Sequence, residues 1–471
     1  MNDTYQSPLT QRYASDDMIK LFSPFTRAKT WRLLWVALAK AQNLTGLNVS
    51  AERVAELAAH TDDIDFECVE KRERQVRHDV MAHVYAYGIA APKAAGIIHL
   101  GATSCYVTDN ADILIYRDAL RIVRERLLGV MKALADFADR YKDMPCLGYT
   151  HYQPAQPVTV GKRASLWLQD FATDLEDLDY LLGSLKLLGC RGTTGTEASF
   201  MELYEGAEDK IDEMNSIIAS EFGFDKKYDV CGQTYPRKLD SRIAAVLSGI
   251  AQSAYKMADD IRLLQHDRQI EEPFEKDQIG SSAMPYKRNP MRCERICSLS
   301  RYIINDYGNT ADTAATQWLE RTLDDSANRR ISLPEGFMAT DAVLILCANI
   351  AGGLVVNEKI VAKTLNDYLP FIATENLLME GVKRGGNRQE LHELIRTASM
   401  KATAAMKNGE SWDLLADLAK DGSFGMSEAE MRNVLDPKLY TGRCASQVSA
   451  YLKKLEPVLA QAKEAECTVK Y

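Results

Sequence analysis

The chain has few residues that interrupt helices or cross-link the backbone. Only 27 glycines and 14 prolines occur in 471 residues, below the roughly 12% that these two residues reach together in average proteins. The ten cysteines include no Cys-x-x-Cys pair and no His/Cys cluster at zinc spacing, so we expect reduced thiols and no metal site. Cys293 and Cys297 lie four residues apart, but two ligands alone do not complete a metal site. These scarcities argue against a disulfide-stapled fold and permit long helices.

The chain also lacks an excess of positive charge, a leader-like start and a long apolar run. Its net charge of −9 argues against a nucleic-acid-binding surface. The first residues, MNDTYQSPLTQRYASDD, do not show the basic-then-apolar order of a secretion signal, so we expect a cytoplasmic protein. The most apolar uncharged stretch, between Asp341 and Glu358, is shorter than the ~20 residues of a membrane span. We predict that it is a buried core helix.

What is present is typical of a large protein built from helices. Hydrophobic residues make up 46% and charged residues 26% of the chain, as in ordinary globular proteins. Apolar residues recur at heptad spacing from Asp109 to Tyr141, at spacings of three and four over residues 164–185, and again from Leu239 to Leu264. These patterns predict long bundle helices and leave little room for strands.

Shorter helical patterns flank the predicted bundle. They cover residues 31–44, 51–59 and 68–87 on the N-terminal side, and the pattern shortens again after Asn357. We therefore predict an all-α chain with an N-terminal helical domain at 1–103, a central long-helix bundle at 104–356 and a C-terminal helical domain at 357–471. Apolar seams on such long helices favour self-association, although a large monomeric bundle would also cover them.

Three polar segments lie between the predicted helices, where packing does not require them. They are HLGATSCYVTDN at 99–110, GYTHYQPAQPVTVGKR at 148–163 and IGSSAMPYKRNPMRCER at 279–295. The third begins as a loop that contains Gly, Ser and Pro. Its end and the residues up to 301 are basic, with Glu294 as the one acidic residue among Lys287, Arg288, Arg292, Arg295 and Arg301. Such a cluster attracts a carboxylate or a polyanion. The alternative is a solvated turn followed by an arginine-rich helix face.

The third and second segments each contain a candidate for proton transfer. Ser281 and Ser282 have the setting in which backbone N–H groups and cations stabilise an alkoxide, and Lys287 and Asn289 could hold a carboxylate beside the carbon being deprotonated. His151 is one of only 7 histidines and lies outside the helical patterns. Its imidazole suits proton exchange near neutral pH, although a histidine in such a loop can also be purely structural.

Two further groups suit ligand binding. Arg77, His78 and Asp79 are expected at a helix end, as a ligand-contact group or as a salt-linked turn. His83 follows five residues after His78, which is not the spacing of a metal pair on one helix face. The segment ERTLDDSANRR at 320–330 places three arginines near a serine, a combination suited to phosphate or to a charged helix end. These residues are Arg321, Ser326, Arg329 and Arg330.

The loop GSSAMPYKRNP resembles the signature loop of the fumarase/aspartase superfamily, Gly-Ser-Ser-x-Met-Pro-x-Lys-x-Asn-Pro. The residue before the loop lysine is usually Gly in fumarases and aspartases and usually Gln in argininosuccinate lyases. Tyr286 at this position resembles the animal-type branch that cleaves adenylosuccinate. The segments RGTTGTEASF and WLERTLDDSANRRI also resemble that branch. The resemblance implies a three-domain helical fold, a homotetramer with a twenty-helix core, and active sites assembled from three subunits. It implies no cofactor, no metal, no nucleic acid and no membrane.

The resemblance also implies β-elimination of fumarate from adenylosuccinate, giving AMP, and from SAICAR, giving AICAR. Ser281 matches the general base, His151 the general acid, and Lys287 and Asn289 match residues that stabilise the aci-carboxylate intermediate. The positions that match ligand-binding residues are Arg12, Tyr13, Arg77, His78, Asp79, Thr103, Ser104, Gln233, Arg295, Arg321, Ser326 and Arg330. Whether His78 only binds or also tunes His151 is left open by the sequence.

Three alternatives are weighed against this activity. An argininosuccinate lyase or a carboxymuconate cycloisomerase would share the superfamily loop, and an inert structural protein could keep the same bundle. The set of His151, Ser281, Lys287 and Asn289 is intact, and a purely structural protein need not retain it.

Overall fold

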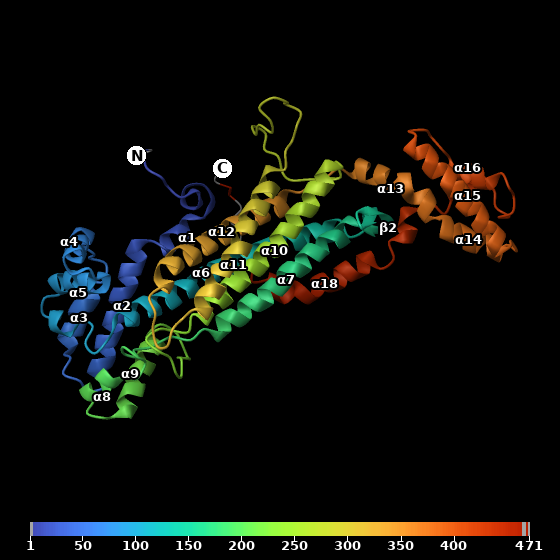
Figure 1. The fold of residues 1–471 in the computed structure, drawn as a ribbon. Helices are drawn as coiled ribbons and strands as arrows, with labels where there is room; N and C mark the ends of the chain where they lie inside the picture. The colour runs from blue at the N-terminus through green and yellow to red at the C-terminus, as the bar shows by residue number, and fades with distance from the viewer. Residues whose placement is uncertain (1–2, 464–467, 470–471) are drawn as a thin grey trace.

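The computed structural model describes residues 3–463 and 468–469. Five long helices form a rod, with short helices at both of its ends (Figure 1). The five are α6 (Ser104–Arg140), α7 (Val160–Ser184), α10 (Lys238–His266), α11 (Met291–Ala315) and α12 (Asp325–Gly353). Three of them, α6, α7 and α10, agree with the long apolar patterns of the sequence, and the predominantly helical fold confirms the expected fold class.

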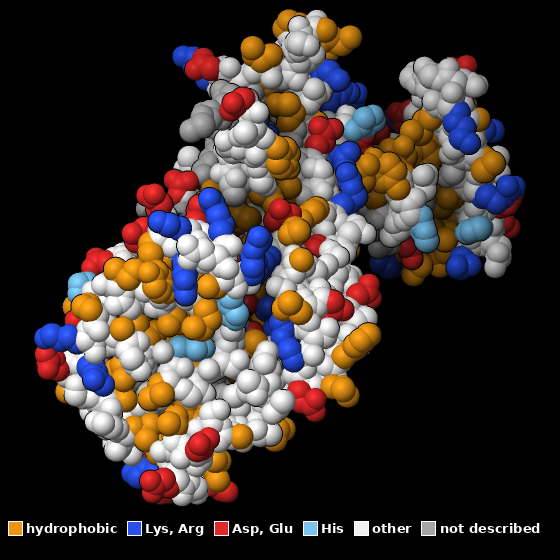
Figure 2. Space-filling view, turned by 60° about the vertical axis from the view of Figure 1, so that its left-hand side comes forward, with side chains coloured by type: hydrophobic (Ala, Val, Ile, Leu, Met, Phe, Trp, Pro, Cys, Tyr) orange, Lys and Arg blue, Asp and Glu red, His pale blue; other side chains and the backbone are white. Residues whose placement is uncertain are grey.

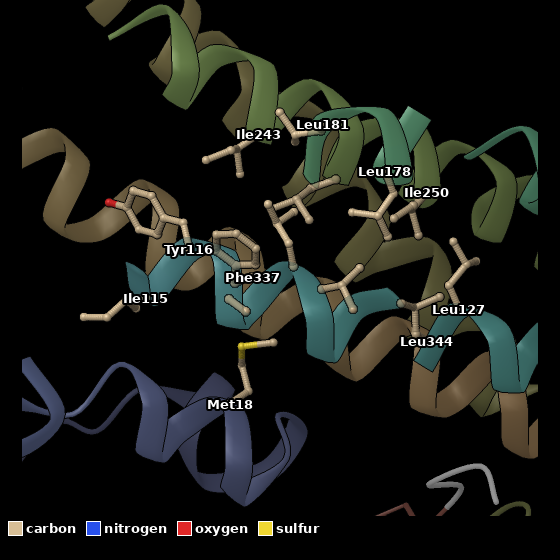
Figure 3. Packing of buried hydrophobic residues seen from close by; sticks show 14 of the residues in the cluster. Met18, Ile115, Tyr116, Leu127, Leu178, Leu181, Ile243, Ile250, Phe337 and Leu344 are labelled. Carbon is tan, nitrogen blue, oxygen red and sulfur yellow. The ribbon is translucent and has the colours of Figure 1, made fainter. Parts of the chain in front are cut away.

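Buried side chains of the five long helices form one continuous core. Leu127 of α6, Leu178 of α7, Ile250 of α10 and Leu344 of α12 point toward one another in this core (Figure 3). Each fully buried side chain of this size contributes about 1.5–3 kcal/mol relative to an exposed one. The α6–α7 pair is closest at Gly161, where an added Cβ would lie 2.2 Å from the carbonyl oxygen of Ala138.

The most apolar of the five long helices is α12, and it lies inside the rod. By length and composition it is the one helix among the described residues that could cross a membrane, but 83% of its most apolar window is buried within the protein. Phe337 of α12 stacks on Tyr116 of α6, with ring centroids 5.9 Å apart. The prediction of a buried core helix is therefore confirmed.

The segment between α6 and α7 is a β-hairpin, which the prediction of a strand-free bundle missed. Strand β1 (Pro145–Thr150) pairs antiparallel with β2 (Gln153–Thr159), and a second small pair joins β3 (Ile270–Glu271) to β4 (Val355–Val356). His151 and Tyr152 form the turn with φ of 52° and 56°. Two positive φ values give the turn whose twist matches a hairpin, and prolines are tolerated in strands that have a free edge.

The N-terminal part contains more helix than was predicted, and one predicted helix is broken. The structure contains α1 (Asp16–Leu21), α2 (Pro24–Leu44), α3 (Ala51–Ala59), α4 (Phe66–Val76) and α5 (Asp79–Ala90), after a short helical turn η1 (Leu9–Tyr13) and before η2 (Ala95–Ile97). The continuous helix predicted over 68–87 is broken because Arg77 adopts a left-handed conformation with φ of 56°. His78 then starts α5 as its N-cap.

The C-terminal part has a hydrophobic cluster of its own and a final helix that returns to the rod. Helices α8 (Ala198–Leu203) and α9 (Glu208–Glu221) connect α7 to α10 and lie at the other end of the rod (Figure 1). The C-terminal elements are α13 (Glu358–Ile372), α14 (Thr374–Lys383), α15 (Arg388–Lys407), α16 (Leu414–Ala419), α17 (Glu428–Arg432), η3 (Pro437–Tyr440) and α18 (Cys444–Leu459). Helix α18 packs against α6 and α7. The three domain boundaries stay a prediction.

Candidate active site

The structure separates the predicted site residues into three groups. The pocket group lines one cavity of about 470 Å³ and consists of Arg77, His78, Asp79, Ser104, Gln233, Arg321, Ser326 and Arg330. Thr103, the N-cap of α6, immediately precedes Ser104 of this group. The hairpin group is His151 alone. The loop group lies on or beside the 281–295 segment and consists of Ser281, Lys287, Asn289, Arg295, Arg12 and Tyr13.

The long helices hold the pocket group away from the other two groups of the same chain. Ser104 begins α6, whose 37 residues extend for about 55 Å before the hairpin that carries His151. Helix α10 starts beside Arg237 at the pocket, and its 29 residues extend for about 43 Å before the chain reaches Ser281. One chain alone therefore does not bring the candidate base and acid to its own pocket.

His78 is held at the pocket wall by the start of α5. Its Nδ1 accepts a hydrogen bond from the backbone N–H of Met81 at 3.3 Å, and its Nε2 lies 3.4 Å from Ser104 Oγ. Asp79 pairs with Arg330 at 3.4 Å, and the Arg330 side chain is 59% exposed. Lys, Arg and His side chains gather near the middle of the face drawn in Figure 2. The prediction that residues 77–79 lie at a helix end is confirmed.

A buried ion-pair network lies beneath the pocket. Arg237 donates to Asp109 on α6 at 2.8 Å and to Asp325 on α12 at 2.6 Å. Asp325 also accepts a hydrogen bond from Arg321 at 2.9 Å. Burial alone would raise the pKa of Asp325, but Arg237 and Arg321 outweigh it, so the pKa is lowered. The carboxylate stays charged and fixes the position of Arg321, a predicted ligand residue.

Arg329 belongs to the same buried ion-pair network, whereas the sequence suggested a phosphate-binding group or a charged helix end. Its guanidinium is buried and pairs with Asp240 at 2.5 Å and with Asp112 at 3.0 Å. It also donates to the hydroxyl of Tyr235. Arg329 is therefore engaged in structural ion pairs, whereas its neighbour Arg330 is exposed. Sequence reasoning missed these acidic partners because single aspartates within a helical pattern usually mark a solvated face.

Ser281 lies in a compact turn with donors around its hydroxyl. Its Oγ accepts hydrogen bonds from the backbone N–H groups of Ala283 at 3.4 Å and Met284 at 3.2 Å. These two donors favour negative charge on the oxygen. The Asn289 side chain donates to the carbonyl of Gly280 at 2.8 Å, so its amide N–H closes the loop in this structure. Lys287 is exposed.

The remaining predicted residues flank this loop and the hairpin. The guanidinium of Arg295, in the second turn of α11, lies 5.3 Å from the ring centroid of Tyr13. The hairpin tip with His151 is exposed, and beside it the rings of Tyr149 and Tyr152 are 5.9 Å apart. Within the described part of the chain, His, Cys, Asp and Glu side chains form no group of three that could hold a metal ion.

Comparisons with known proteins extend over nearly the whole chain. Residues 10–304 match the family model described as lyase, and residues 370–451 match the model described as adenylosuccinate lyase C-terminus. The adenylosuccinate lyase of Saccharomyces cerevisiae is 48% identical over 456 residues, which cover 96% of this chain and 95% of the yeast protein. That of Schistosoma mansoni is 44% identical over 98% of this chain and 97% of its own length.

Solved structures match the fold. A 3-carboxy-cis,cis-muconate lactonizing enzyme from Pseudomonas putida has a TM-score of 0.83 at 22% identity, covering 96% of this chain and 99% of its own. A fumarate lyase from Mesorhizobium has a TM-score of 0.80 at 24% identity, covering 96% of this chain and 99% of its own. The chain belongs to the adenylosuccinate lyase family, within the fumarase/aspartase superfamily.

Proposed function

We propose that this protein eliminates fumarate from adenylosuccinate, giving AMP, and from SAICAR, giving AICAR. The observation that carries the proposal is the 48% identity to a named adenylosuccinate lyase over 96% of the chain. Purified protein should release fumarate from both purine ribotides and leave argininosuccinate intact. Fumarate from argininosuccinate but not from adenylosuccinate would instead support the argininosuccinate lyase alternative.

Two groups divide the proton transfers in the proposed reaction. Ser281, as the alkoxide, removes a proton from the succinyl carbon next to a carboxylate, and Lys287 stabilises the doubly charged aci-carboxylate that results. The C–N bond then breaks, and His151 gives a proton to the departing nitrogen. Two backbone N–H groups on Ser281 Oγ support the first role. The guanidinium groups of Arg12 and Arg295 beside the loop attract the substrate carboxylates.

Single substitutions test these roles. General acid–base groups typically contribute ~10²–10⁴-fold to rate, so Ser281→Ala and His151→Ala should each lose almost all turnover. Both variants should remain folded, because the two side chains are at most half-buried and lie outside the core. Near-normal turnover by either folded variant would remove its residue from the mechanism.

The proposal includes a homotetramer in which three subunits supply each active site. The separation of the pocket group from the hairpin and loop groups by helices of about 55 Å and 43 Å supports it. Light scattering on the purified protein should give about four times the mass of 52.7 kDa. The free cysteines of the described chain support the cytoplasm as the proposed location.

A further inference from the structure

The two ends of the loop that carries Ser281 are tied together by a buried carboxylate. Glu272 lies where the loop begins and is 3% exposed. Its two oxygens accept hydrogen bonds from the backbone N–H groups of Arg292 at 3.1 Å and Cys293 at 2.9 Å, where the loop ends. These N–H groups belong to the first turn of α11, whose helix dipole favours a negative charge at this place.

Arg292 and Gln265 join the same clasp to the long helices. The Arg292 guanidinium donates to the carbonyl of Pro273 at 3.1 Å and to Asn349 of α12 at 2.9 Å. Gln265 of α10 accepts from the Glu272 N–H at 3.1 Å and donates to the carbonyl of Arg288 at 3.1 Å. We call Gln265, Glu272 and Arg292 the loop neck. The neck fastens both ends of residues 273–291 to three helices.

Beyond the neck the loop has few ties to the rest of the protein. Ile279 and Tyr286 are 77% and 83% exposed. Figure 1 shows this segment projecting away from the rod between α10 and α11. The direction in which Ser281 points is therefore determined chiefly at the neck.

We propose that Glu272 is a positioning residue for the elimination, which fixes the orientation of the Ser281 loop relative to Arg295 one turn further along α11. This proposal rests on the proposed role of Ser281. In Glu272→Gln one oxygen is replaced by an NH2 group, so one of the two buried N–H groups loses its acceptor and faces a second donor, and the two ends of the loop can separate. A displacement of about 1 Å at a reacting group can lower a rate by about 10²-fold, whereas contacts in the distant pocket are preserved.

The test compares Glu272→Gln with Glu275→Gln. The control residue lies on the same loop and pairs with the same Arg292, but its side chain is 70% exposed. We expect Glu272→Gln to lower kcat for adenylosuccinate by about 10- to 100-fold while KM changes by less than about threefold. Trypsin should cut more quickly after Arg288 in this variant. The control should stay within about twofold of the unmodified protein in all three measurements.

Several outcomes would overturn the proposal. Unchanged kcat and unchanged trypsin cleavage in Glu272→Gln would do so, and so would equal losses in both variants. If Glu272→Gln does not fold, Glu272→Asp replaces it, and the same split between kcat and KM decides. Failure of the proposed function is seen separately, because it would appear as a lack of fumarate release by the unmodified protein or as full activity of Ser281→Ala.

Discussion

Mixing two inactive variants tests whether active sites combine residues from different chains. Ser281→Ala lacks the proposed base, and His151→Ala lacks the proposed acid. If the two residues reach a site from different subunits, some sites in a mixed tetramer will receive an intact copy of both. Each variant alone contains no such site, so any recovered turnover must come from hybrids.

The expected recovery follows from random mixing at equal amounts. A site works only if its His151 comes from a Ser281→Ala chain and its Ser281 comes from a His151→Ala chain. Each condition holds in half of the sites, so about one quarter should be active. The proposed sharing predicts the same result for an inactive variant of the pocket residue Ser104 mixed with either one, because α6 alone extends for about 55 Å.

The assay is fumarate release after the two proteins are unfolded together in urea and refolded, with each variant treated alone as the baseline. A matched control mixes Ser281→Ala with Lys287→Met. Residues 281 and 287 lie on the same loop, and every chain in this mixture carries one of the two substitutions. Each site therefore receives a damaged loop, and we expect no recovery. Recovery near one quarter in this control, or none in the Ser281 and His151 mixture, would refute the assignment of Ser281 and His151 to different subunits of one site.

Three further changes test the packing and charge of the bundle. Gly161→Ala would place a Cβ 2.2 Å from a carbonyl oxygen of α6. Urea unfolding should therefore show a free energy of unfolding lower by about 1–3 kcal/mol, and an unchanged urea midpoint would contradict this. Arg237→Met leaves two buried carboxylates without this partner, so the free energy of unfolding should fall by ~3–5 kcal/mol. A fall of less than about 1 kcal/mol would contradict the stabilising role of the ion-pair network. Burial raises the pKa of Asp174 to about 6, whereas in the unfolded chain it is about 3.9. The ionised form is thus penalised only in the folded state, so unfolding free energy should fall by up to about 3 kcal/mol as pH rises from about 4 to about 6, and Asp174→Asn should remove that slope.

Helices α6, α7 and α10 were predictable because their apolar spacing is maintained for many turns. The β-hairpin was not, because its turn is formed by His151 and Tyr152 rather than by the Asn-Gly or Asp-Gly pairs that signal such a turn. The apolar pattern over 68–87 likewise did not show the break between α4 and α5, which only the expected helix end at residues 77–79 indicated. Arg77 adopts a left-handed conformation that few residues other than glycine and asparagine favour, so the helical pattern runs through it without a visible stop.

The candidate site residues could be predicted from short motifs, whereas the buried ion pairs that hold them in place could not. Ser281 and its loop are recognisable in a local string of letters. The partners that hold the site are far apart in sequence: Asp109 and Arg237 differ by 128 positions, and Asp325 lies a further 88 positions on. Such pairs become visible only when α6, α10 and α12 are packed side by side.

The proposed mechanism places residues of more than one chain at each site. A serine hydroxyl acts as a base only where donors and cations stabilise its alkoxide and water is excluded. In a single subunit the loop supplies two backbone donors to Ser281, yet Ile279 and Tyr286 beside it remain largely exposed. Exposed apolar side chains of this size on a reactive loop are expected to be covered when the site is complete. The apolar cover must therefore come from outside the loop, and the lengths of α6 and α10 place the pocket of its own chain too far away to provide it.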